Sequence, residues 1–199
     1  MGLPLAVAAR WIPISIIPLL LLTAAGCALV LQRVCHVRLR DLLRAGALRA
    51  GWGKMLAIYC LAVVALWVAL WWFKPDALFS LLLRHPRIWL LVMFAYPLIS
   101  VLPQELIYRA YFFERYRPLF GRGNLMVAMS AAVFALGHVV FHNAISVVLT
   151  LMGGWLFART YQRTSSLLRV SVEHALYGCA IFTLGYGQFF LEGTLRLFK

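Results

Sequence analysis

Acidic residues are scarce in this chain. Its 199 residues include 6 Asp and Glu against 19 Lys and Arg, and charged residues make up only 13% of the sequence. So little charge excludes a typical soluble domain, in which about a quarter of the residues are charged. It also excludes nucleic-acid binding, because the bases lie in short stretches between apolar runs and leave too little polar surface for a binding face.

The motifs of several common hydrolase classes are absent as well. The sequence has no Gly-x-Ser-x-Gly nucleophile motif, no paired membrane aspartates and no reactive Cys–His arrangement. Its 4 cysteines, Cys27, Cys35, Cys60 and Cys179, are scattered and form no metal or disulfide framework. The sequence therefore indicates no hydrolase that forms a covalent intermediate on Ser or Cys or that uses a pair of aspartates.

Long apolar runs dominate what remains. Hydrophobic residues make up 64% of the chain and its mean hydropathy is +0.88. Because about 20 apolar residues suffice to cross a bilayer, we predict an all-α, multi-pass membrane protein with about six transmembrane helices around a convergent polar cavity. The predicted spans are 11–31, 55–73, 88–113, 125–141, 144–158 and 170–190, and the third passes through Pro97 and Pro103.

Basic residues mark the predicted inner side of the membrane. Segment 33–54 carries six bases and predicts a short amphipathic helix at the membrane surface. Its apolar residues Val37, Leu39, Leu42 and Leu43 are expected to face lipid. With the N-terminus outside, the inner loops hold 12 of the 19 bases and the outer side holds 6. The positive-inside rule then places the basic loops in the cytoplasm.

Few polar residues lie within the predicted spans. Burying an ionisable group at that depth costs on the order of 3 kcal/mol or more, so each needs a partner or a watery cavity and is a functional-site candidate. Glu105 and Arg109 are four residues apart and can pair on one helix face. The alternative for them is a buried pair that only joins two helices. The full set is Gln104, Glu105, Arg109, His138, His142, Asn143, Glu173 and His174.

The histidines of this set come from separate helices. His138 and His142 are four residues apart, a spacing that puts both rings on one helix face and that metal sites use. No Glu follows His138, so the zincin pattern is not met. His174 stands at the start of the last span. A carboxylate, an imidazole and a polar donor that converge in a cavity can activate water and stabilise an oxyanion.

The order of these motifs resembles the CAAX protease and bacteriocin-processing (CPBP) family of intramembrane proteases, also called the type II CAAX prenyl endopeptidase or Abi family. That family carries Glu-Glu-x-x-x-Arg, Phe-x-x-x-His and His-x-x-x-Asn on separate membrane helices. The matching stretches here are 104–109, 134–138 and 174–178. The resemblance implies N-terminal membrane helices with a basic cytoplasmic amphipathic segment over 1–95, a CPBP-like catalytic core over 96–190 and a C-terminal tail over 191–199.

Two positions depart from the family pattern. Gln104 stands where the family has its first Glu, which activates water together with the first His, and a Gln has no carboxylate to accept a proton. Gly178 replaces the family's final Asn, an oxyanion donor, for which Asn143 is the candidate substitute. Glu105 would serve as base if Pro103 unwound the helix locally, because adjacent helix positions point about 100° apart.

The resemblance implies an intramembrane endopeptidase that cleaves a peptide or membrane-protein substrate in the inner membrane of a bacterium. The expected catalytic residues are Glu105, as base or orienter, Arg109, as its partner, His138, as water ligand, and His174, as transition-state donor. The expected surrounding residues are Gln104, His142, Asn143 and Glu173. The sequence requires no cofactor, and the metal it permits is zinc, with Glu105, His138 and His174 as ligands.

Two other functions stay open. Gln104 favours a catalytically impaired peptide-binding or immunity protein of the same fold. A small proton-coupled carrier would use Glu105 and the histidines as a relay, although the sequence has no internal inverted repeat.

Straight helices would place Glu105 and His138 about 9 Å apart in depth within the membrane. Tilt or a shifted helix boundary has to close that gap if the site is to form.

Overall fold

The apolar sequence folds into helices because a helix satisfies its own backbone N–H and C=O groups where no water is present. The computed structural model describes residues 16–45, 48 and 51–190. Within these ranges its regular structure is helical and includes no strand. The all-α prediction is therefore confirmed for this part of the chain.

Six helical segments are long and apolar enough to cross a membrane. They are Ile16–Arg33 (α2), Trp52–Phe73 (α4), Pro86–Phe120, Asn124–Phe141, Ala144–Thr164 (α10) and Leu167–Leu184 (α11). Between α4 and the third segment lie the short elements η2 (Pro75–Ala77) and α5 (Ser80–Arg84). The number agrees with the six predicted spans, and the multi-pass membrane class is confirmed.

The third segment is a continuous helix that contains two π-helical stretches. Its parts are α6 (Pro86–Tyr96), η3 (Pro97–Val101), α7 (Leu102–Glu105), η4 (Leu106–Tyr111) and α8 (Phe112–Phe120). Pro97 begins η3 and Pro103 is the second residue of α7, and the helix continues through both although neither proline can donate a backbone hydrogen bond. It runs past the predicted end at 113 and stops at Phe120, where Gly121 adopts a positive φ of 67°.

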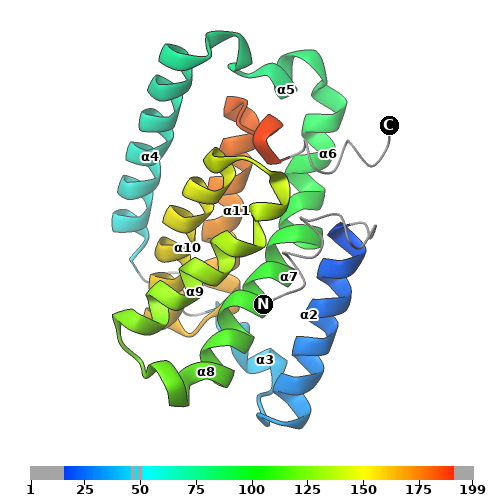
Figure 1. The fold of residues 1–199 in the computed structure, drawn as a ribbon, viewed down its shortest axis with the longest axis vertical. Coiled ribbons are helices and arrows are strands. Elements are labelled where there is room, and N and C mark those ends of the chain that lie inside the picture. The colour runs from blue at the N-terminus through cyan, green and yellow to red at the C-terminus, as the bar shows by residue number, and fades with distance from the viewer. Residues whose placement is uncertain (1–15, 46–47, 49–50, 191–199) are drawn as a thin grey trace.

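The helix α11 is central and α4 is peripheral. Of the apolar window of α11, 56% is buried, against 6% for α4, whose side chains are left for lipid. The helices α9 (Asn124–Gly137) and α10 pack side by side, and α2 packs against the third segment near α7 and η4 (Figure 1). Between these helices the core cluster consists of Leu31, Ala110, Phe134, Phe157, Tyr161, Leu167, Val170 and Tyr177.

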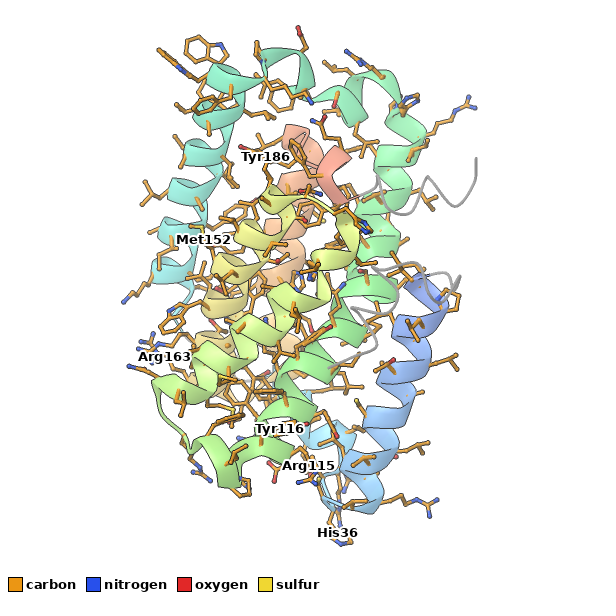
Figure 2. All side chains as sticks on the ribbon, viewed as in Figure 1. His36, Arg115, Tyr116, Met152, Arg163 and Tyr186 are labelled. Carbon is orange, nitrogen blue, oxygen red and sulfur yellow. The ribbon has the colours of Figure 1, made fainter. Side chains whose placement is uncertain are left out.

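One end of the bundle gathers the basic connections. The α8–α9 turn, the α10–α11 turn and the short helix α3 (Leu39–Leu42) all lie at this end (Figure 1). Figure 2 shows Arg115, Arg163 and His36 near it, whereas Tyr186 lies towards the opposite end. The fold therefore keeps the predicted inner loops together on one side of the bundle.

The basic connection after α2 differs from the predicted surface helix. The helix α3 has only four residues, and Val37, Leu39 and Leu42 pack against the core cluster instead of facing lipid. The chain turns back at His36, which has a positive φ of 56°, and this turn brings the apolar side chains under the bundle. Residues 46–47 and 49–50 of this connection, like the predicted tail 191–199, lie outside the described residues.

Candidate active site

A cavity of about 830 Å³ lies among the spans and has a mostly apolar wall. One stripe of the third segment contributes four polar side chains to it, at steps of four residues: Tyr96, Ser100, Gln104 and Tyr108. On a straight α-helix each such step overshoots a full turn by about 40°, so the stripe would drift off one face. The wider turns of η3 and η4 reduce this drift and keep the four groups on one wall of the cavity.

Glu105 and Arg109 lie on the neighbouring stripe, behind the cavity wall. Both side chains are 0% exposed, and Arg109 Nε lies 3.3 Å from Glu105 Oε2. The guanidinium also donates to Ser130 Oγ at 3.5 Å and lies over the ring of Phe134, 4.7 Å from its centroid. The predicted pair is therefore present, and its arginine ties the third segment to α9.

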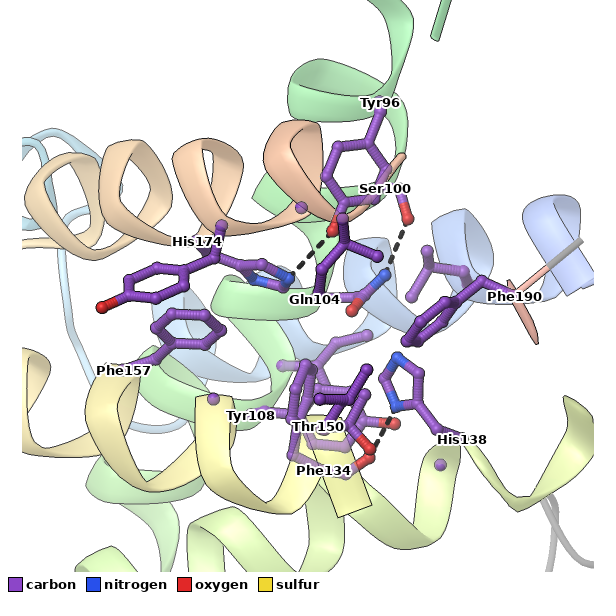
Figure 3. Close-up of a pocket in the computed structure, with 18 of the residues that line it drawn as sticks. Tyr96, Ser100, Gln104, Tyr108, Phe134, His138, Thr150, Phe157, His174 and Phe190 are labelled. Atoms are coloured by element: carbon purple, nitrogen blue, oxygen red, sulfur yellow. Dashed lines mark hydrogen bonds between the residues drawn. The ribbon is translucent and has the colours of Figure 1, made fainter. Parts of the chain in front are cut away.

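Glu105 also holds His174 of α11. Glu105 Oε1 lies 2.7 Å from His174 Nδ1, and His174 Nε2 lies 3.1 Å from the Tyr96 hydroxyl. A carboxylate only accepts hydrogen bonds, so we assign the ring proton to Nδ1, and Nε2 then accepts from Tyr96. The imidazole stacks on Phe157, with ring centroids 4.5 Å apart. A chain of hydrogen bonds thus runs from the buried carboxylate through His174 to Tyr96 at the cavity wall. Figure 3 shows its second link, between His174 and Tyr96.

His138 stands where α9 gives way to η5 (Val139–Phe141). Its Nδ1 donates to the carbonyl oxygen of Phe134 at 2.8 Å, so Nε2 of the neutral ring carries a lone pair. Figure 3 shows this second nitrogen directed into the cavity, towards Gln104. Gln104 donates to Ser100 Oγ at 2.7 Å, and its own Oε1 is buried without a hydrogen-bond partner among the described residues. His138 and Gln104 therefore line the same cavity, and the unsatisfied amide oxygen of Gln104 is itself buried.

Helix length closes the predicted gap in depth between Glu105 and His138. Glu105 lies 15 residues before the end of α8 at Phe120, and His138 lies 14 residues after the start of α9 at Asn124. At 1.5 Å per residue, both stand about 22 Å from the α8–α9 turn. The extension of the third segment beyond residue 113 is what brings the two levels together.

His142 does not share the helix face of His138. The helix α9 ends at Gly137, and His142 follows η5 with a positive φ of 56°. This change of backbone direction carries its side chain to a separate recess of about 300 Å³ on the other side of the turn. The expectation of two rings on one helical face is wrong because the helix stops before it reaches the second ring.

Asn143 and Glu173 also lie outside the main cavity. Asn143 caps α10: its Oδ1 accepts from the backbone N–H of Ser146 at 2.8 Å, and its amide donates to the carbonyl of Phe189 at 2.7 Å. The amide that could have replaced the family's oxyanion donor is therefore occupied by the cap of α10 and by the backbone after α11. Glu173 is buried on α11 against Thr160 and does not line the cavity.

The three predicted zinc ligands do not form a ligand set. The Glu105 carboxylate faces Arg109 and His174 behind the cavity wall, and both ring nitrogens of His174 are hydrogen-bonded. His138 and His174 line the cavity, but Glu105 does not. Across the described ranges, no group of three His, Cys, Asp or Glu side chains is arranged to hold a metal ion. We therefore derive no step of the chemistry through zinc.

Sequence reasoning does not single out Tyr96 or Ser100, although both line the cavity. Their signal is the four-residue spacing that leads from Tyr96 to the Gln104 motif, and it is hard to see because Pro97 falls between them. The Tyr96 ring packs directly against Gly178 of α11, so closely that a Cβ on residue 178 would overlap the ring. That contact joins two helices far apart in sequence.

Six spans around a cavity that is lined by two histidines and an amide define a polytopic membrane protein with a candidate hydrolytic or binding site. Residues 86–180 match the family model of type II CAAX prenyl endopeptidase Rce1-like proteins. The predicted resemblance to the CAAX protease family is confirmed. No curated protein and no solved structure matches the chain.

Proposed function

We propose that the protein is an intramembrane endopeptidase of the CAAX-protease type, which hydrolyses a peptide bond with water held in the cavity. The observation that carries this proposal is the convergence of Gln104, His138 and His174, from three helices, on one cavity among the membrane spans. Polar groups at that depth are costly, so their convergence favours a site over incidental packing. The Rce1-like family of this domain supports the same reaction class.

His138 is the proposed base. Its Nε2 takes a proton from water, and the water oxygen bonds to the carbonyl carbon of the substrate to give a tetrahedral oxyanion. When the intermediate collapses, the C–N bond breaks and the leaving amine takes that proton from Nε2. The hydrogen bond from Nδ1 to Phe134 orients the ring for both steps. Gln104, which lines the same cavity, holds this water beside the imidazole.

Glu105 is the proposed positioning residue rather than the base. Its carboxylate does not border the cavity, and its two oxygens face His174 and Arg109. It sets the tautomer and the orientation of His174, and Arg109 compensates its charge. Of the two roles considered for Glu105 from the sequence, the geometry supports that of orienter.

The proposed substrate is a peptide or membrane-protein segment that enters from the lipid. Residues of α2, α4 and the third segment line the apolar part of the cavity, and the membrane-facing surfaces of these helices are rich in exposed leucine and tryptophan. The proposed location is a bacterial inner membrane with the basic end of the bundle in the cytoplasm. Catalysis there would act on chains already inserted in or anchored to the bilayer.

The test uses purified protein in lipid vesicles with a quenched fluorescent peptide library that includes lipid-modified peptides. We expect the wild type to cleave and His138→Ala to lose cleavage on the order of 100-fold or more, the usual contribution of a positioned base. Asn143→Ala, which alters a residue outside the cavity, is the control and should keep its activity. Absence of cleavage by both the wild type and Gln104→Glu would contradict the proposal.

A second function is favoured by one observation: none of the described carboxylates lines the cavity, and the position of the family's first Glu holds Gln104. This favours a membrane peptide-binding protein with the protease fold. If the wild type is silent while Gln104→Glu cleaves, the binder is the correct reading. The same vesicles would then show that the wild type retains, without cutting, the peptides that Gln104→Glu cleaves.

A further inference from the structure

The Tyr96 hydroxyl is the last group in the chain of hydrogen bonds that runs from the buried Glu105 carboxylate through His174 to the cavity. It stands at the end of α6, and its ring is held between Phe182 and His174, with ring centroids 5.2 and 6.1 Å away. The hydroxyl lies 3.1 Å from His174 Nε2. A phenol held this way has few rotamers left, so its oxygen is fixed relative to the cavity.

The space for this phenol exists because residue 178 has no side chain. A Cβ at Gly178 would overlap the hydroxyl and ring carbons of Tyr96, and φ at Gly178 is not in the left-handed region. The glycine therefore serves no backbone turn: it lies in the middle of α11, where glycine costs about 1 kcal/mol relative to alanine. What this position provides is the close approach of Tyr96 to His174.

We infer that Tyr96 is a catalytic residue of the proposed peptidase, whose hydroxyl donates a hydrogen bond to the oxyanion of the tetrahedral intermediate, with His174 and Gly178 holding it in place. This inference rests on the proposed function. In the resting site the O–H points to the imidazole, because a neutral substrate carbonyl is no better an acceptor than Nε2. Hydrogen bonds to a charged acceptor are about twice as strong, so the O–H turns to the substrate oxygen only as negative charge develops.

That exchange is selective for the transition state, which is the condition for a contact to raise kcat rather than only to tighten substrate binding. Tyr96 keeps its proton throughout, and the proton that travels is the one passed from water through His138 to the leaving amine. The Glu105–His174 pair contributes by fixing where the phenol oxygen lies. Its rigidity limits the reorganisation needed when the oxyanion forms.

The experiment measures kcat and KM in vesicles, with the peptide cleaved by the wild type or, if only that variant cuts, in the Gln104→Glu background. Tyr96→Phe removes one oxygen and should lower kcat on the order of 100-fold, the effect of losing an oxyanion donor. KM should stay within about threefold, because the contact is absent from the ground state. Tyr186→Phe is the matched control: its hydroxyl donates to the Leu66 carbonyl at 3.0 Å, and Tyr186 does not line the cavity, so its kcat should be unchanged.

A rescue pair separates loss of the donor from loss of structure. Gly178→Asn should be inactive because its side chain overlaps the Tyr96 ring. Tyr96→Ala should be inactive because the donor is gone. Tyr96→Ala combined with Gly178→Asn removes the overlap and places an amide donor in the vacated space. We expect the kcat of this double variant to be at least about tenfold higher than that of either single variant, because the effects of substitutions at residues in direct contact are not additive.

The outcomes separate the two proposals. If neither the wild type nor Gln104→Glu cleaves, both the proposed function and the role of Tyr96 are overturned. If the wild type cleaves and Tyr96→Phe keeps kcat within about threefold, the role of Tyr96 is overturned and the peptidase stands. If only Gln104→Glu cleaves and Tyr96→Phe in that background keeps kcat within about threefold, the role of Tyr96 is overturned and the wild type is a binder. A Tyr96→Phe defect confined to KM would also overturn it, because that pattern indicates substrate binding without transition-state stabilisation.

Discussion

The buried pair of Glu105 and Arg109 allows a sharp prediction about stability. Its two charged atoms are 3.3 Å apart with both side chains 0% exposed, whereas Glu114 and Arg117 on α8 are closer, at 2.9 Å, but 32% and 43% exposed. If the distance between the charged atoms alone decided how much stability is lost with the acid, losing Glu114 would cost more than losing Glu105. Because water screens exposed charges and solvates the one left behind, we expect the opposite order.

The magnitude follows from what Glu105→Ala leaves behind. The Arg109 guanidinium would keep only Ser130 Oγ at 3.5 Å and the ring faces of Phe134 and Phe157 as neighbours that interact with its charge. Removing one partner of a buried pair costs about 3–5 kcal/mol, since the remaining charge is uncompensated. The corresponding change at Glu114 should cost less than about 1 kcal/mol.

The assay is unfolding in mixed micelles, followed by circular dichroism and tryptophan fluorescence, for Glu105→Ala, Glu105→Gln, Arg109→Met, the double variant Glu105→Ala/Arg109→Met, and Glu114→Ala. Glu105→Gln should be intermediate, because its amide oxygen still accepts from His174. The double variant should be more stable than Glu105→Ala, because no charge is left buried. A free energy of unfolding for Glu105→Ala within about 1 kcal/mol of the wild type, and equal to that of Glu114→Ala, would refute the reasoning.

Three further predictions follow from single features of the fold. Gly185→Ala should lower the unfolding temperature by several degrees, because φ at Gly185 is +116° and the new Cβ would overlap the carbonyl oxygen of Ala77. The control is Gly123→Ala, where the structure leaves open space for the new Cβ. Asn143→Ala should lose about 1 kcal/mol of stability as the cap of α10 is removed, while kcat is retained; a large drop in kcat at unchanged stability would restore its candidacy as an oxyanion donor. With the 4 native cysteines replaced, Arg122→Cys should react with an impermeant thiol reagent only from the cytoplasmic side and Lys74→Cys only from the other, and the reverse pattern would invert the proposed orientation.

The helical class and the number of spans were predictable because they depend on local chemistry. A run of about 20 apolar residues in a bilayer has no way to satisfy its backbone groups other than a helix, whatever its neighbours are. The pairing of Glu105 with Arg109 was predictable for the same reason, because a four-residue spacing brings two side chains together within one helix. The family pattern likewise predicts which of the few buried polar residues belong to one site, and their catalytic roles stay predictions.

Tertiary structure decided which of the adjacent residues Gln104 and Glu105 faces the cavity. The π-helical turns and the uninterrupted path through Pro103 set that rotation, and both depend on how the third segment packs against α2 and α9. Packing also decided that α9 ends before His142, which separates this ring from His138. The contact of Tyr96 with Gly178 joins residues 82 positions apart, and no periodicity within either helix reports it. Spacing along the sequence determines which side chains share one face of a helix. The packing of helices against one another determines which residues that face contacts.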